Sequence, residues 1–210
     1  MTEKRLKRIE QVVGNRQFDL TVVLNNVHDP HNIGAVLRSC DSVGIKEIYV
    51  LYTDNRLDEE NLILGKKAAS SARKWVDVFY YNDVEKCFDT IKKKYDNILG
   101  TKLNSEAVSL YDLDLTGSLA LVFGNERDGI SEEVLPYLTG NFIIPQVGMI
   151  QSLNISVAVA VSLYETFRQR NSKNMYNAEN SVNEIDRKNL LEDYIERHKT
   201  RHTGRLMIKK

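Results

Sequence analysis

The chain has 210 residues, of which 42% are apolar, so it is long enough for one domain or for one domain with short appendages. Its 29 Lys and Arg balance its 29 Asp and Glu, so its overall charge gives no sign of a nucleic-acid partner. Two cysteines outside any C-x-x-C pattern argue against a disulfide framework or a zinc site. The basic N-terminus without an apolar signal and the lack of a membrane-length apolar run predict a cytoplasmic protein with no metal and no membrane partner.

Apolar periodicity predicts strands that alternate with helices through residues 20–170. A short basic helix over 2–13 precedes them, and a helix over 184–200 follows an Asn- and Ser-rich linker at 171–183. The expected strands cover residues 20–25, 46–52, 75–81, 97–101, 118–124 and 141–145. The expected helices between them cover residues 32–43, 82–94, 131–138 and 154–170, with Asn32 and Ser131 as N-terminal caps and Gly44 as a C-terminal cap.

This alternation is typical of an α/β fold with a parallel sheet, in which ligands bind outside the carboxyl ends of the strands. Three polar loops fall at such positions, at residues 25–32, 124–130 and 145–154. We expect three parts, namely a basic N-terminal helical extension, a central domain, and a linker with a C-terminal helical extension. Their boundaries are 1–19, 20–172 and 173–210.

Positive charge gathers at the two ends of the chain. Residues 1–16 carry five Lys or Arg against two Asp or Glu, and residues 186–210 carry eight against four, so the remaining residues are net acidic. Basic ends on an acidic body suggest that the termini hold an anionic partner. The same pattern also keeps charged helices soluble, and charge alone does not separate the two explanations.

The first polar loop leads into a helix that carries Asn32 and Arg38. Asn32 lies at the expected helix start, and Arg38 lies six residues later among apolar residues. A buried Arg needs an anionic partner, whereas a surface Arg or an internal ion pair is the more common case for any single Arg. His28 and His31 lack acidic or Cys ligands at a fitting spacing, so we interpret them as turn residues rather than metal ligands.

The second and third loops contain the remaining candidates. Gly124 and Gly129 bracket Glu126 at a strand end, and Ser152 and Asn154 crowd at the mouth of an apolar helix. A charged surface turn and plain helix capping are the simpler explanations. No G-x-G-x-x-G and no phosphate-binding G-x-x-x-x-G-K-[ST] occurs, which argues against an ordinary dinucleotide or P-loop site.

Three segments in this order, HNIGAVLRSCDSVG, LVFGNERDGIS and IPQVGMIQSLNISVAVAVSLYE, resemble the motifs of the SpoU/TrmH family of SPOUT methyltransferases. The resemblance covers roughly residues 20–170. It implies a parallel sheet with helices on both faces and a deep trefoil knot toward its C-terminus. It also implies bound S-adenosylmethionine and an obligate homodimer.

The resemblance assigns roles to individual residues of this chain. Arg38 would be the catalytic arginine, reaching toward the cofactor of the partner subunit, and Asn32 would position it. Glu126 would be the acidic residue of the second motif, with Ser152 and Asn154 the polar pair of the third. The cofactor would contact Thr101, Gly124, Ile144 and Leu153, mostly through backbone groups.

The termini narrow the substrate that the resemblance implies. The ends of this chain look like those of family members that methylate the ribose of guanosine 18 in the tRNA D-loop. RNA phosphates would then be held by Arg5, Arg8, Arg168 and Arg170. Two alternatives stay open: a ribose of ribosomal RNA or of another tRNA position, and an RNA-binding protein without catalysis.

Overall fold

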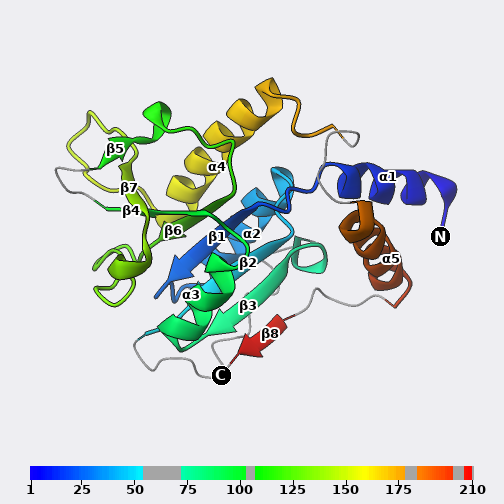
Figure 1. Ribbon diagram of the computed structural model, residues 1–210, viewed down its shortest axis with the longest axis horizontal. Coiled ribbons are helices and arrows are strands. Elements are labelled where there is room, and N and C mark those ends of the chain that lie inside the picture. Colours follow the sequence, from blue (N-terminus) through cyan, green and yellow to red (C-terminus); the bar gives the residue numbers. More distant parts are fainter. Residues whose placement is uncertain (54–71, 103–106, 178–183, 201–205, 210) are drawn as a thin grey trace.

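Eight parallel strands form one sheet in the computed structural model, which describes residues 1–53, 72–102, 107–177, 184–200 and 206–209 (Figure 1). Their order across the sheet is β5-β7-β4-β6-β1-β2-β3-β8. The strands are β1 Leu20–Asn25, β2 Glu47–Leu51, β3 Asp77–Tyr81, β4 Asn97–Thr101, β5 Val108–Ser109, β6 Leu119–Phe123, β7 Gly140–Ile143 and β8 Leu206–Lys209.

Helices cover both faces of this sheet. The helices are α1 Glu3–Gly14, α2 Pro30–Ser42, α3 Val84–Lys92, α4 Ile155–Ser172 and α5 Glu184–Thr200. Helices α2 and α4 pack side by side on one face, α3 packs on the other, and α1 lies against α5 beside the sheet (Figure 1). The prediction of a parallel α/β sheet with short terminal helices is confirmed.

The central strands explain why both faces need a cover. Every residue of β1, β2 and β6 is buried, which is typical of parallel strands enclosed between two helical layers. Side chains of β1 alternate between the two cores, with Leu20, Val22 and Leu24 facing α2 and α4 and Val23 facing α3. The two apolar cores therefore hold the carboxyl ends of the central strands in fixed places.

Three local predictions were wrong. Helix α2 begins at Pro30 and is capped by Asp29, whose side chain accepts from the His31 N–H at 2.8 Å, so Asn32 is not the cap. The expected helix at 131–138 is reduced to a 3₁₀ turn at Leu135–Tyr137, and Ser131 does not cap it, since its buried hydroxyl has no hydrogen-bond partner within the described part of the chain. The two short edge strands β5 and β8 were not predicted.

Buried arginines hold the ends of the chain against the sheet. Arg16 donates to the carboxylate of Asp41 at 2.5 Å and to the carbonyl of Ile45 at 2.8 Å. Arg197 of α5 forms an ion pair with Asp77 of β3 at 2.8 Å, and neighbouring Tyr194 donates to a backbone carbonyl. The charges of Arg16 and Arg197 are therefore neutralised inside the protein by Asp41 and Asp77. Both arginines belong to the basic ends of the sequence, but neither is available to an outside partner.

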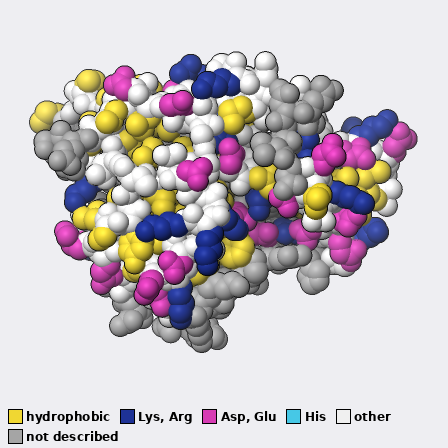
Figure 2. Space-filling view, viewed as in Figure 1, with side chains coloured by type: hydrophobic (Ala, Val, Ile, Leu, Met, Phe, Trp, Pro, Cys, Tyr) yellow, Lys and Arg dark blue, Asp and Glu magenta, His cyan; other side chains and the backbone are white. Residues whose placement is uncertain are grey.

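Charge is mixed over the face drawn in Figure 2. Lys and Arg side chains alternate there with Asp and Glu, including over the region of α1 and α5. The drawn face therefore carries no single continuous basic field. In the part of the chain that the structure describes, no helix is both long enough and apolar enough to cross a bilayer.

A buried carboxylate joins β2 to the end of α3. Glu47 is 3% exposed and accepts from Lys46 at 2.7 Å, Lys94 at 2.6 Å, Tyr49 at 2.8 Å and Tyr95 at 3.2 Å. Burial alone would raise the pKa of Glu47, but the charges and hydrogen bonds of Lys46 and Lys94 outweigh it and lower the pKa to about 2. The ionised form is therefore the one that the fold stabilises.

This network makes stability depend on pH. Because the folded pKa of Glu47 lies below its ordinary value of 4.5, its contribution is complete above about pH 4.5 and is lost as the pH falls toward 2. We expect Glu47→Gln to lower the free energy of unfolding at pH 7 by up to about 3 kcal/mol, and the deficit to shrink below pH 4.5. Urea denaturation followed by circular dichroism at several pH values measures both.

Glu85→Gln is the matched control, because Glu85 is exposed on α3. It should change the unfolding free energy far less at every pH. A Glu47→Gln deficit that stayed constant from pH 7 to pH 3 would assign the effect to side-chain shape rather than to charge.

Candidate active site

Three segments that are far apart in the sequence are joined by two side-chain hydrogen bonds. The amide nitrogen of Asn32, in the first turn of α2, donates to the carboxylate of Glu126 at 2.7 Å. The amide nitrogen of Asn154, the N-cap of α4, donates to the amide oxygen of Asn32 at 3.2 Å. We call these three residues the Asn32 cluster. It brings together one predicted site residue from each polar loop.

Asn32 can bridge the other loops because it does not cap its own helix. Asp29 accepts the free N–H of His31, and Pro30 needs no partner for a backbone N–H. Both polar atoms of the Asn32 side chain are then directed outward, to Glu126 and to Asn154. Neither atom is hydrogen-bonded to Arg38 within the described part of the chain, so the role of Asn32 in positioning Arg38 stays a prediction.

The loop that carries Glu126 is closed on itself. Asn125 and Gly129 exchange two backbone hydrogen bonds of 3.0 and 2.9 Å, and the φ of Gly129 is +69°. A Cβ on Gly124 would lie 2.0 Å from the carbonyl carbon of Gly129, so only glycine fits there. The glycine pair therefore sets where Glu126 emerges from the sheet.

Two asparagines at the end of β1 fasten this loop to the central strand. Asn125 donates from its side chain to the carbonyl of Asn26 at 3.1 Å, and buried Asn25 accepts from the backbone N–H of Ser131 at 2.8 Å. Sequence reasoning missed Asn25 and Asn125 as positioning residues. The signal available was an Asn-Asn pair at the end of a fully apolar strand, where a buried amide must find partners.

The loop between β7 and α4 has open backbone groups. Residues 144–153 make no backbone–backbone hydrogen bond with any other described residue outside the sheet ladder, and Gln146 donates to the carbonyl of Gln151 at 3.3 Å. Ser152 is exposed and makes no hydrogen bond with the described part of the chain. Such a loop can offer N–H and C=O groups to a ligand.

The residues predicted to contact a cofactor border this loop and the neighbouring strand ends. Thr101 ends β4, Gly124 follows β6 and is buried, and Ile144 and Leu153 flank the loop and are half-buried. Together they supply backbone and apolar groups with little charge. This fits a nucleoside-sized ligand held by the backbone.

Arg38 lies outside the Asn32 cluster. It is six residues further along α2 than Asn32, about 9 Å along the helix axis, and its side chain is exposed. Among the described residues it has no hydrogen bond or ion pair. The sequence allowed either a buried Arg38 with an anionic partner or an Arg38 at the surface, and the structure shows Arg38 at the surface. Its guanidinium is therefore available to an anion from outside this chain.

The four arginines predicted to hold RNA fall into two groups. Arg5 and Arg8 are exposed on α1, and Arg168 is exposed but paired with Glu165 through bonds of 2.8 and 2.9 Å. Arg170 is 0% exposed and donates to Asp19 at 2.6 Å and to three other oxygens. Arg170 is therefore a structural residue, and its prediction as a phosphate ligand was wrong.

The two histidines of the first loop serve the turn. His31 gives its backbone N–H to Asp29, and His28 stacks on Tyr52 with ring centroids 5.2 Å apart. In the described ranges, no three His, Cys, Asp or Glu side chains group in a way that could hold a metal ion.

Comparison with known proteins places these features in a family context. The model of the SpoU rRNA Methylase family matches residues 19–164. A Thermus thermophilus protein named tRNA (guanosine(18)-2′-O)-methyltransferase is 39% identical over 175 residues, which cover 83% of this chain and 88% of that protein. An Escherichia coli protein of the same name is 36% identical over 182 residues, covering 87% and 77%.

The fold agrees with a solved structure as well. The crystal structure of the Aquifex aeolicus TrmH/SpoU tRNA modifying enzyme matches with a TM-score of 0.80 and 34% sequence identity. The match covers 93% of this chain and 97% of that one.

The closed loop at Gly124 leads to a direct test. We expect Gly124→Ala to destabilise the protein by about 1–3 kcal/mol, because the added methyl group overlaps the Gly129 backbone. Gly148→Ala is the matched control, since a Cβ there meets no atom within 4 Å. Thermal unfolding compares the two, and equal melting temperatures would contradict the close approach of Gly124 to Gly129.

Proposed function

The chain belongs to the SpoU rRNA methylase family, and on that premise we propose that it methylates the ribose 2′-hydroxyl of guanosine 18 in tRNA. The structural observation that carries the proposal is the Asn32 cluster, which joins the three motif segments at one edge of the sheet. The choice of tRNA and of guanosine 18 rests on relatives that match most of the chain at 36–39% identity.

The methyl donor is S-adenosylmethionine, the cofactor of this family. Its sulfonium group supplies a methyl group that an oxygen nucleophile can take. The groups that would hold it are the open backbone of residues 144–153 and the strand ends at Thr101 and Gly124. Ile144 and Leu153 would cover the adenosine with apolar surface.

Arg38 acts on the RNA rather than as a base. A guanidinium stays protonated in proteins, so it cannot accept the proton of the ribose hydroxyl. Exposed and unpaired among the described residues, Arg38 instead binds the phosphate beside the target ribose and stabilises negative charge developing on the oxygen. The proton leaves to phosphate or to water.

The Asn32 cluster serves as the frame of the site. Glu126 accepts from Asn32, and Asn32 accepts from Asn154, so a shift of any one loop strains the other two. Ser152, exposed two residues before Asn154, is then placed on the same edge. Alignment of the ribose oxygen with the methyl group depends on this frame, and such alignment supplies much of the rate of a transfer reaction.

A homodimer would complete the site. Exposed large apolar side chains stand around the loop and along α4, namely Val147, Met149, Ile150, Val157 and Tyr164. Exposed apolar surface of this kind is typical of an interface. A second copy that covers it would also give Arg38 a partner site to reach.

The strand order supports a knotted chain. Strands β4 and β5 follow each other in the sequence, yet β7 lies between them in the sheet. The segment that enters through β7 and leaves as α4 must therefore pass the connection between β4 and β5. We propose that this passage forms the trefoil knot.

We also propose that the chain is divided into three parts. Residues 20–172 form the knotted catalytic part, and residues 1–19 and 173–210 form its RNA-binding ends. We also propose that the protein acts in the cytoplasm, in keeping with a tRNA substrate.

The role of Arg38 can be separated from cofactor binding. We expect Arg38→Ala to lower the rate of methyl transfer to a tRNA transcript by at least about 100-fold, because it removes the cation beside the developing negative charge. Its affinity for S-adenosylmethionine, measured by calorimetry, should persist. Radiolabelled S-adenosylmethionine and an unmodified transcript give the rate.

Lys93→Ala provides the matched control, because Lys93 is an exposed cation at the end of α3, on the opposite face of the sheet. It should retain full activity. Wild type and both variants should sediment at twice the monomer mass of 24.1 kDa. If Arg38→Ala lost its affinity for S-adenosylmethionine, Arg38 would have a role in cofactor binding instead. If the wild type sedimented as a monomer, the proposal that Arg38 reaches the site of a partner subunit would fail.

A further inference from the structure

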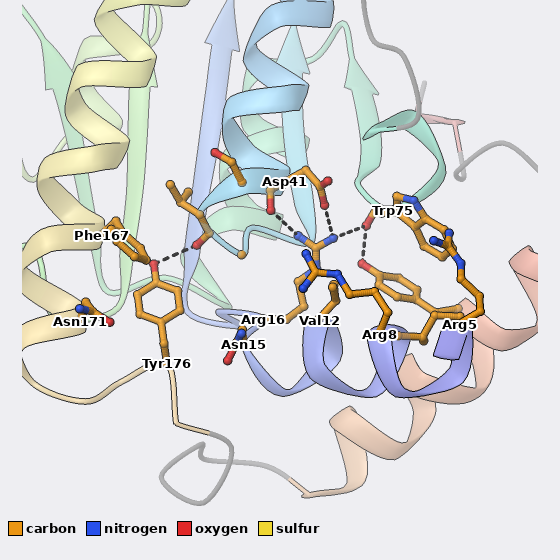
Figure 3. A pocket seen from close by; sticks show the side chains of 15 residues that line it. Arg5, Arg8, Val12, Asn15, Arg16, Asp41, Trp75, Phe167, Asn171 and Tyr176 are labelled. Atoms are coloured by element: carbon orange, nitrogen blue, oxygen red, sulfur yellow. Dashed lines mark hydrogen bonds and ion pairs between the residues drawn. The ribbon is translucent and has the colours of Figure 1, made fainter. Parts of the chain in front are cut away.

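A groove of about 810 Å³ lies between α1 and the C-terminal ends of α2 and α4 (Figure 3). Pockets for small molecules have volumes in this range. The groove is separate from the Asn32 cluster, because Ser42 on its wall lies ten residues after Asn32, about 15 Å further along α2. Of the roles described above, only the predicted phosphate contacts of Arg5 and Arg8 fall within it.

One side of the groove is positively charged. Arg5 and Arg8 line it from α1, and the guanidinium carbon of Arg5 lies 5.4 Å from the ring centroid of Trp75. The ammonium of Lys74 lies 5.3 Å from the same ring. Desolvation lowers the pKa of nearby His198, and the charges of Arg5, Lys74 and the amino terminus lower it further. Several cations therefore share one small region.

The acid in the groove wall does not cancel this charge. The lining includes a single carboxylate, Asp41, and buried Arg16 holds it at 2.5 Å. Arg16 is itself 1% exposed. The exposed cations of α1 are therefore left to attract an anion such as a phosphate.

The other side of the groove is aromatic. The rings of Phe167 and Tyr176 lie 4.9 Å apart at 54°, and the hydroxyl of Tyr176 donates to the carbonyl of Val43 at 2.9 Å. Figure 3 shows these rings across the groove from Arg8 and Trp75. A tyrosine ring fixed by a neighbouring ring and by its own hydroxyl is a rigid surface on which a planar group can stack.

Two side-chain amides are available beside these rings. Asn15 follows α1, Asn171 lies in the last turn of α4, and both line the groove. Neither side chain makes a hydrogen bond with another residue in the described part of the chain. An amide offers both a donor and an acceptor, the combination that reads the edge of a base.

We propose that this groove binds one unstacked nucleotide of the RNA substrate, with its phosphate at Arg5 and Arg8 and its base beside Tyr176 and Asn171. Proteins recognise single-stranded RNA by this combination of cations, aromatic stacking and amides. Ser42 follows Arg38 by four residues and lies on the same side of α2, so one RNA strand can run from the groove to Arg38. The inference rests on the proposed function for its choice of RNA.

Trp75 reports on the groove directly, because it is the only tryptophan of the chain. Its fluorescence should change as the full-length protein is titrated with an unmodified tRNA transcript. Arg8→Ala and Asn171→Ala should each raise the Kd for that transcript about 10-fold. Arg8→Ala should also reduce the salt dependence of binding by about one phosphate contact, whereas Asn171→Ala should leave it unchanged.

Lys7→Ala is the matched control, since Lys7 is an exposed cation of α1 that does not line the groove. It should bind the transcript like wild type. Unchanged Kd values for both groove variants, or constant Trp75 fluorescence at RNA saturation, would overturn the proposal and leave the groove to a protein segment. If the wild type transferred no methyl group but Asn171→Ala still weakened RNA binding, the proposed reaction would fail while the groove stood.

Discussion

The hydrogen bonds of one amide side chain hold the candidate site together. Asn32 donates to Glu126 and accepts from Asn154, so a single residue in the first turn of α2 joins the loops that follow β6 and β7. Asn32 is 94 residues from Glu126 and 122 residues from Asn154 in the sequence, and β6 and β7 do not pair with each other in the sheet. Everything proposed about catalysis depends on that bridge, because the ribose and the methyl donor must be aligned by groups from all three loops.

Helices α2 and α4 connect the candidate methyl-transfer site at one end with the proposed RNA-binding groove at the other. The N-terminal ends of α2 and α4 carry Asn32 and Asn154 of the Asn32 cluster, and their C-terminal turns line the groove that faces α1. Buried ion pairs of Arg16, Arg170 and Arg197 hold the terminal segments against this framework. Positions at the two ends of α2 are therefore fixed relative to each other by the packed helix itself.

Much of the sheet was predictable because apolar runs such as LTVVLN allow few alternatives. Strand β5 was missed because its two residues are too few to show a hydrophobic period. Strand β8 was missed because its short apolar run lies within a basic C-terminal segment. The site residues Asn32, Glu126 and Asn154 were identified from the motif resemblance, but their mutual bonds were not, because side-chain partners so distant in sequence leave no local pattern. Arg170 was misassigned since exposure of a helical Arg depends on what packs against it.

The measurement that tests this account most directly is the position of the transferred methyl group. An unmodified tRNA transcript is incubated with the protein and S-adenosylmethionine, digested with nuclease and examined by mass spectrometry. The account predicts one methyl group per tRNA, on the ribose of guanosine 18. A methyl group on a base, on another ribose, or only on ribosomal RNA offered in parallel would contradict it.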